Sequence, residues 1–243
     1  MGQIIINVLF TFFLYLIISL SFTIIFNTSK FFNISHAAVI TLGGYITYFL
    51  SQQIGLNNFL AIPIGCAIAT LFGMVFELVI FRKMRKSGAS SLMLLIASLG
   101  IYIIFENLIS LFWGVKTLSL HTGEIEAGRK FFGGYITDYQ IIIIAVSALL
   151  FLLVVTFLKY SNLGMLIRAV SSNKELANIF GINSNKVILK TIAVGSTIAA
   201  IGGVLMSFNI GMTPTMGFNL LVFGVVTMIL GGIGSTWGLV GGA

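Results

Sequence analysis

Few residues in this sequence are of the types that carry out enzymatic chemistry. Among its 243 residues there are two histidines, His36 and His121, one cysteine, Cys66, and six acidic residues. The motifs H-E-x-x-H, G-x-S-x-G and G-x-x-x-x-G-K-[ST] are absent from the sequence, so it lacks the patterns of a zinc site, a serine nucleophile and a phosphate-binding loop. A lone cysteine can form neither an internal disulfide nor a cysteine-based metal site. We therefore expect no enzymatic reaction, metal or cofactor in this chain.

A second group of candidates is the polar residues that interrupt long apolar runs. Polar groups at membrane depth face a cavity or another helix, and broken helices often mark a transport route. Asn33, Ser35 and His36 lie in such a break, and the pair Gly43-Gly44 follows within the next apolar run. We expect these residues to lie along a translocation pathway. For His36 the alternative is hydrogen-bonded packing inside the protein.

Two acidic residues, Glu77 and Glu106, lie inside apolar runs. Glu77 is within about a helical turn or so of Arg82 and Lys83, which predicts an ion pair at the membrane interface. Glu106 lies deeper in its run, beside Asn107. It is expected either to line the pathway or to pair with a neighbouring helix.

A short helix of about ten residues is predicted at 172–181. Ser172 and Glu175 have the S-x-x-E spacing of a capping box, in which the serine hydroxyl accepts a first-turn amide and the glutamate reaches back. Gly181 suits the left-handed residue that ends a helix, with Ile182 as the accompanying hydrophobe. A helix of this length is too short to span a bilayer.

This short helix carries one apolar stripe. Leu176, Ile179 and Phe180 recur with the i, i+3, i+4 spacing of a single helix face. The stripe either rests on lipid headgroups or inserts into a groove of a partner protein. The sequence physics alone leaves both possibilities open.

The sequence contains seven apolar runs, and most of them approach the roughly 20 residues that a membrane-spanning helix needs. The composition agrees, because 58% of the residues are hydrophobic and 8% are charged, against roughly 25% charged in soluble domains. A soluble enzyme, a disordered chain and a collagen-like fibre are thereby excluded. The expected fold is all-α, a single-domain polytopic transmembrane bundle with about seven or eight membrane segments. The runs are 4–26, 31–50, 59–81, 90–113, 141–158, 191–210 and 218–230.

Basic residues set the expected orientation, because loops on the inner side of a membrane are rich in Lys and Arg. Lys30, the cluster at 82–86 and the stretch at 159–190 with five basic residues are therefore placed inside. The loop at 114–140 has no net charge and is placed outside, as is the N-terminus. The net charge of +7 lies beside the apolar runs, so it indicates membrane topology rather than nucleic-acid binding.

Three parts of the chain together resemble the permease subunits of branched-chain amino acid ABC importers. The stretch IRAVSSNKELANIFGINSNKV is similar to that family's cytoplasmic coupling loop. The segment at 32–45 resembles the N-F-A-H-G…G-A-Y segment of the first of the two permeases, with Ser35-His36-Ala37 in place of Ala-His-Gly. The segments TPTMGF at 213–218 and LGGIGS at 230–235 complete the family's order, and relatives commonly run on for another span, so we expect this chain to stop short of the last one. The matching positions of the coupling loop are Arg168-Ala169, Glu175-Leu176-Ala177 and Gly181-Ile182-Asn183.

The resemblance implies an importer in a bacterial plasma (inner) membrane. Such importers combine two permease subunits, usually different chains, with two cytoplasmic ATPase subunits and an extracytoplasmic substrate-binding protein. This chain would form a translocation path for branched-chain or related hydrophobic amino acids, and the ATPases would bind ATP and magnesium. The helix at 172–181 would be the contact that the ATPases move. The implied ATPase-coupling residues are Ser172, Glu175, Leu176, Ala177, Ile179, Phe180 and Gly181.

Other functions stay open at this point. Members of the same superfamily carry urea and short amides. A secondary transporter would offer repeated halves and intramembrane charges, but we find no convincing repeat, and Glu77 and Glu106 are the acids within spans. A glycine-rich bundle can also form a channel. Neither a secondary transporter nor a channel accounts for the capped helix on the inner face.

Overall fold

The chain folds almost entirely into helices, as its apolar runs predict. Its computed structural model describes residues 1–120, 128–131, 134–209, 211–232 and 238–243. His121 and residues 233–235 of the glycine-rich segment lie outside this part of the chain. The all-α, multi-pass bundle expected from the sequence is confirmed.

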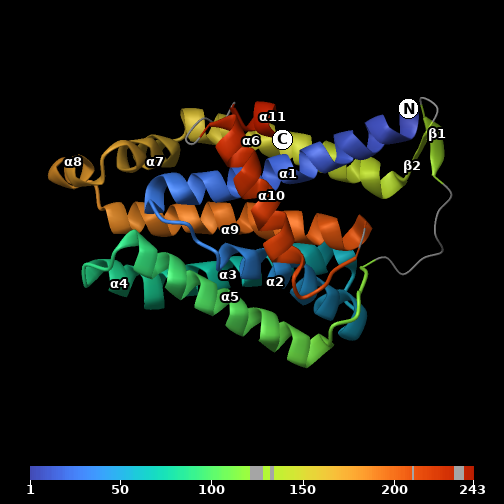
Figure 1. Ribbon diagram of the computed structural model, residues 1–243, viewed down its shortest axis with the longest axis horizontal. Coiled ribbons are helices and arrows are strands. Elements are labelled where there is room, and N and C mark those ends of the chain that lie inside the picture. The colour runs from blue at the N-terminus through green and yellow to red at the C-terminus, as the bar shows by residue number, and fades with distance from the viewer. Residues whose placement is uncertain (121–127, 132–133, 210, 233–237) are drawn as a thin grey trace.

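Within the described residues, five helices are long and apolar enough to cross a membrane. They lie roughly along one direction, the long axis of Figure 1. One of them, Asn58–Lys86, is composite, because a π-helical stretch interrupts its α-helical hydrogen bonding. The five are α1 (Gly2–Ser29), α3 (Asn58–Phe76) continued by η2 (Glu77–Phe81) and α4 (Arg82–Lys86), α5 (Ser91–Trp113), α6 (Asp138–Tyr160) and α9 (Ser184–Asn209).

The two remaining apolar runs form shorter helices. The run at 31–50 gives α2 (His36–Tyr48), extended by the π-helix η1 (Phe49–Gln53), and the run at 218–230 lies within α10 (Met216–Gly231). Helix α10 crosses the other helices at a steep angle (Figure 1). All seven expected membrane segments are therefore helical, and five of them have the length of a full span.

The polar segments gather at the two ends of the bundle. Helices α7 (Asn162–Ser172) and α8 (Lys174–Ile179) lie at the same end as α4, while the N-terminus and the strands β1 (Arg129–Phe131) and β2 (Gly134–Ile136) lie at the other end (Figure 1). The strands pair antiparallel. A short helix, α11 (Gly238–Gly242), packs against α10. The basic 159–190 stretch thus contains two helices where the sequence predicts one.

The centre of the bundle is built around α1 and α9, which are the most buried of the long helices. Helix α9 packs against α1, α2 and α3. Small residues allow the backbones to approach closely where lipid supplies no hydrophobic drive. At Gly43 of α2, a methyl group would lie 2.6 Å from the carbonyl oxygen of Ala200 on α9. Helices α2 and α9 are therefore in direct backbone contact.

Candidate functional site

Helix α8 is the core of the candidate coupling site, and its start differs from the sequence prediction. Ser172 is the last residue of α7 and does not cap α8, so the predicted Ser172–Glu175 capping box is wrong. Asn173, with φ −151° and ψ 108°, is the N-cap, and its Oδ1 accepts the N–H of Leu176 at 2.9 Å. Asparagine caps helices as well as serine does, and its extended backbone separates α7 from α8. The predicted ten-residue helix is therefore six residues long.

The end of α8 has the geometry that the sequence indicates. Gly181 has φ +80°, in the left-handed region that side-chain-bearing residues avoid. The N–H of Ile182 donates to the carbonyl of Ala177, and the N–H of Gly181 donates to the carbonyl of Asn178, both at 3.0 Å. This pair of bonds is a Schellman motif, which satisfies the last carbonyls of the helix. The chain thus turns sharply after Phe180.

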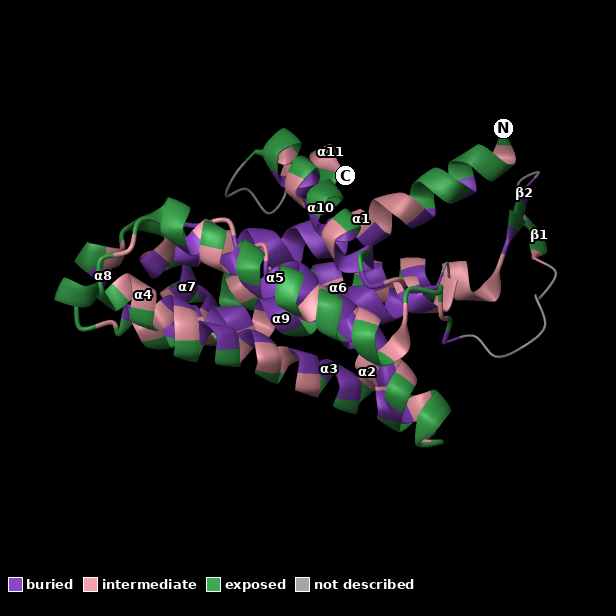
Figure 2. Ribbon diagram, turned by 60° about the horizontal axis from the view of Figure 1, so that its bottom comes forward, coloured by how far each residue is buried: buried purple, intermediate pink, exposed green. Residues whose placement is uncertain are grey.

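The apolar stripe of α8 points away from the protein. Leu176, Ile179 and Phe180 are 50%, 79% and 76% exposed. Ala177, on the opposite side, is buried in a small cluster with residues of α7 and α9, including Val170. Figure 2 shows α8 as an exposed projection at the end of the bundle. Three neighbouring apolar side chains held outward on a capped helix form a compact surface for a partner or for lipid headgroups.

Helix α8 is joined directly to the long helix α9. The hydroxyl of Ser184, the first residue of α9, lies 2.6 Å from Oδ1 of Asn178 and 3.3 Å from the carbonyl oxygen of Lys174. The Ser184 N–H also donates to Asn178 Oδ1, at 3.3 Å. A displacement of α8 is therefore transmitted to the start of α9, whose other end reaches the opposite side of the bundle.

A buried ion pair lies at the same end of the bundle. Glu77, whose side chain is 0% exposed, binds the guanidinium of Arg85, which is 9% exposed. Both carboxylate oxygens are used, one at 3.1 Å from Nη1 and the other in a shorter contact with Nη2. The predicted partners, Arg82 and Lys83, are wrong, because the π-helix over 77–81 changes the register of the following turn.

This ion pair also acts on α8 through Lys174. Burial, and then the positive charge of Arg85, lower the pKa of Lys174, while the Glu77 carboxylate opposes that shift. The first residue of α8 is therefore within electrostatic reach of the composite α3–η2–α4 helix.

The polar residues expected along the pathway are inside the subunit. Asn33, Ser35 and His36 are at most 5% exposed. The Ser35 hydroxyl donates to Asn33 Oδ1 at 2.6 Å, and His36 Nε2 lies 3.0 Å from the hydroxyl of Ser21. Because Ser21 donates its one hydrogen to the carbonyl of Ile18, it accepts from His36, which assigns the Nε2–H tautomer. These three residues tie the start of α2 to α1.

The other expected pathway residues, Gly43, Gly44 and Glu106, are not brought together with Asn33, Ser35 and His36. Gly43 and Gly44 face α9, where an added Cβ would meet the backbone of Ala200 at Gly43 and the hydroxyl of Ser207 at Gly44. At Gly44 it would also lie 2.8 Å from the methyl carbon of Met216, the first residue of α10. Glu106 is half-buried on α5, and its carboxylate interacts with Tyr102 one turn earlier on the same helix. The cavity lined by Trp113 and the cavity lined by Tyr15 contain none of the six expected residues.

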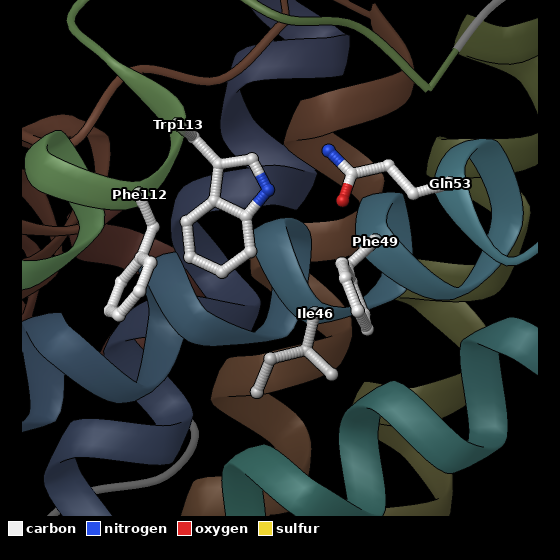
Figure 3. Close-up of a pocket in the computed structure, with 5 residues that line it drawn as sticks. All are labelled: Ile46, Phe49, Gln53, Phe112 and Trp113. Atoms are coloured by element: carbon white, nitrogen blue, oxygen red, sulfur yellow. The ribbon is translucent and has the colours of Figure 1, made fainter.

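One cavity, which the sequence does not indicate, lies at the end of the bundle opposite α8. It has a volume of about 270 Å³ and is formed where η1 meets the end of α5. Figure 3 shows Trp113 between Phe112 on one side and Gln53 on the other, with Phe49 and Ile46 below. Trp113 also packs against Tyr45, with ring centroids 5.5 Å apart. Aromatic residues at the end of a span are typical of a membrane–water interface.

The bundle of long apolar helices defines a multi-pass membrane protein. The chain belongs to the family described as branched-chain amino acid transport system, permease component, which matches residues 4–243. It is 30% identical to the high-affinity branched-chain amino acid transport system permease protein LivH of Escherichia coli (strain K12), over 94% of this chain and 78% of that protein. It is 28% identical to the corresponding protein BraD of Pseudomonas aeruginosa, over 91% of this chain and 76% of that protein.

A more distant relative has another substrate in its name. The fructose import permease protein FruF of Bifidobacterium longum is 21% identical over 94% of this chain and 63% of that protein. No solved structure matches the chain significantly. The resemblance of the coupling-loop and break segments to this permease family is thereby confirmed at the level of the whole chain.

Proposed function

We propose that this chain is a permease subunit that carries branched-chain or related hydrophobic amino acids into a bacterial cell. The names of the LivH and BraD relatives support this substrate class. The proposal places the chain in the plasma membrane with its N-terminus outside, on the argument that the basic segments at 82–86 and 159–190 face inward.

The proposed assembly contains this chain, a second and different permease, two cytoplasmic ATPase subunits and a substrate-binding protein outside. ATP and magnesium are bound by the ATPases, since this sequence has no phosphate-binding loop. The permease itself needs neither a cofactor nor a catalytic residue. Its role is to form the path and to convert movement of the ATPases into a change of that path.

The observation that carries the proposal is the exposed stripe of α8. Leu176, Ile179 and Phe180 would fill a groove on an ATPase subunit, with Glu175 in the first turn and Ala177 and Ser172 on the supporting side. When the ATPases close, α8 moves, and the Ser184 contacts carry that movement into α9. Because α9 packs on α1, α2 and α3, its displacement moves the helices at the centre of the bundle.

A secondary transporter is less well supported than an ATP-driven importer. Ion coupling requires intramembrane acids that can bind and release a cation or proton. Of the two acids within spans, Glu77 is neutralised by Arg85 and Glu106 interacts with Tyr102. The exposed coupling helix has no role in such a mechanism.

The substitution Gly181→Val tests the coupling role. A β-branched residue at φ +80° is strained by about 1–3 kcal/mol, which would break the turn after Phe180. We expect the variant to remain in the membrane with its partners' basal ATP hydrolysis intact, and to lose the stimulation of ATP hydrolysis by leucine-loaded binding protein.

The matched control is Gly88→Val. Gly88 also has a left-handed backbone, φ +76°, follows α4 at the same end of the bundle, and, like Gly181, has open space where a side chain would go. Its backbone strain is therefore similar, but it lies outside α8. Normal stimulation in Gly181→Val, or equal loss in both variants, would contradict the docking role and would favour a helix resting on headgroups.

The substrate is tested by measuring ATP-dependent uptake of leucine, valine and urea into proteoliposomes that contain the complete complex. Uptake of leucine or valine supports the proposal. Uptake of urea alone would assign the chain to an amide importer of the same family, and the absence of any co-purifying ATPase would favour a transporter of another class.

A further inference from the structure

The second cavity lies beside the break between α9 and α10, toward the end of the bundle at which α5 and α9 finish. It has a volume of about 300 Å³, at the lower end of the range for small-molecule sites, roughly 300–1,000 Å³. One wall is Tyr15, at the middle of α1, whose ring stacks on Phe223 of α10 with centroids 4.9 Å apart.

The backbone next to this cavity is irregular. After α9 ends at Asn209, residues 211–215 return toward the middle of the bundle before α10 begins. Met212 exchanges two backbone hydrogen bonds with Leu118, at 2.7 and 3.0 Å, and the N–H of Gly217 donates to Thr41 of α2 at 3.2 Å. Irregular backbone in a membrane is tolerated where it is buried in protein or lines a water-filled cavity. Breaks between transmembrane helices commonly form substrate sites in transporters.

The lining combines polar groups with apolar ones and contains no Asp, Glu, Lys, Arg or His. Thr213 and Asn219 supply a hydroxyl and an amide, which can both donate and accept hydrogen bonds. Met206, Met216 and Phe223 supply an apolar wall. A ligand that suits this lining is small, has no net charge, and carries hydrogen-bonding groups at one end and an aliphatic group at the other.

Asn219 is the most informative member of the lining. It is exposed on α10, a helix with an otherwise apolar sequence, and its side chain makes no hydrogen bond within the described part of the chain. An amide left without partners in hydrocarbon costs several kcal/mol. Its position is therefore accounted for if it faces a hydrated path rather than lipid.

We propose that this cavity is a transit site for a zwitterionic aliphatic amino acid, resting on the proposed function above. The ammonium and carboxylate groups of the substrate meet the Asn219 amide and the Thr213 hydroxyl. Its side chain packs on Met206, Met216 and Phe223. The site is distinct from the buried Asn33–His36 segment, whose polar groups are already paired within the subunit.

The test uses the complete complex with binding protein and ATPases in proteoliposomes. Asn219→Leu removes the amide and keeps the number and branching of the side chain's heavy atoms, and the matched control is Asn107→Leu. Asn107 is also an exposed amide on a spanning helix, but its Nδ2 donates to the carbonyl of Ile103 at 2.8 Å. We expect leucine uptake to fall about tenfold or more in Asn219→Leu, the effect of losing one hydrogen bond to a charged group, and to change by less than about twofold in the control.

A second measurement places the substrate directly. In a Cys66→Ala background, Asn219→Cys is labelled with a membrane-impermeant thiol reagent, and saturating leucine is expected to slow labelling about fivefold or more while the zwitterionic but acidic glutamate does not. The transit site would be overturned if Asn219→Leu takes up leucine as fast as the wild-type complex and leucine does not slow the labelling of Asn219→Cys. Leucine uptake by the wild-type complex would then leave the proposed function intact. A wild-type complex that takes up urea but not leucine would overturn the assignment of an aliphatic amino acid as the ligand of this cavity. A wild-type complex that transports neither would overturn the proposed function itself.

Discussion

The buried pair between Glu77 and Arg85 allows a quantitative test of how charge is held at the end of the bundle that carries α8. The substitution Arg85→Gln leaves the Glu77 carboxylate, at 0% exposure, without its bidentate partner. Removing one member of a buried ion pair costs about 3–5 kcal/mol of unfolding free energy, because the remaining charge stays desolvated. The equivalent change Arg129→Gln breaks a pair with Asp138 whose side chains are 76% and 43% exposed. Exposed pairs contribute about 0–1 kcal/mol.

Both variants can be measured by unfolding the purified chain in mixed detergent micelles and following its tryptophan fluorescence. We expect a large loss of unfolding free energy for Arg85→Gln and almost none for Arg129→Gln, although each substitution removes one positive charge. The double variant Glu77→Leu with Arg85→Met should recover most of the loss, since apolar replacement of a buried pair is often neutral or stabilising. Equal small losses in the two single variants would refute the argument that burial decides the effect.

Three further predictions concern α8 and the centre of the bundle. Asn173→Ala should cost about 1 kcal/mol of local helix stability, seen as faster hydrogen exchange of the α8 amides; unchanged exchange would contradict the cap. Lys174→Met should raise the melting temperature at neutral pH, because burial and the charge of Arg85 lower the pKa of Lys174 in the folded state. That advantage should shrink as the pH rises through the ordinary lysine pKa, above which Lys174 is neutral in both states; a pH-independent difference would argue against it. Gly43→Leu should cost about 1–3 kcal/mol by overpacking against the α9 backbone, measured as detergent resistance, and a neutral effect would show that the helices can separate.

The positions of the long helices follow directly from the apolar runs. The run at 90–113 corresponds to α5 (Ser91–Trp113), and the run at 141–158 lies within α6 (Asp138–Tyr160). Helix α9 begins at Ser184, seven residues before the apolar run at 191–210. This first part of the helix contains Lys186 and Lys190 and lies outside the apolar run. Hydropathy locates the part of a helix in hydrocarbon, whereas capping and packing decide where the helix ends.

Local capping is only partly predictable from sequence. The turn at Gly181 was identifiable because a single residue type suits that backbone, and the Schellman bonds are present. The start of α8 was not identifiable from sequence, because Ser172 and Asn173 are both good N-cap residues and tertiary contacts decide between them. The partner of Glu77 was missed for a different reason. A π-helical turn leaves no mark in hydrophobic periodicity, so the register of Arg85 follows only from the folded chain.

The candidate pathway shows most clearly what a polar residue in an apolar run does and does not indicate. Asn33 and His36 at the first break and Asn219 beyond the Pro214 break look equivalent in sequence, because each is a polar group within a membrane segment. The fold separates them by whether the polar atoms are paired. His36 binds Ser21 inside the subunit, whereas the Asn219 amide is directed to a cavity with an apolar wall. A paired polar group contributes to the packing of the helices, and an unpaired one that faces a cavity requires water or substrate as its partner. For this permease, the break that matters for transport is therefore inferred to be the one between α9 and α10.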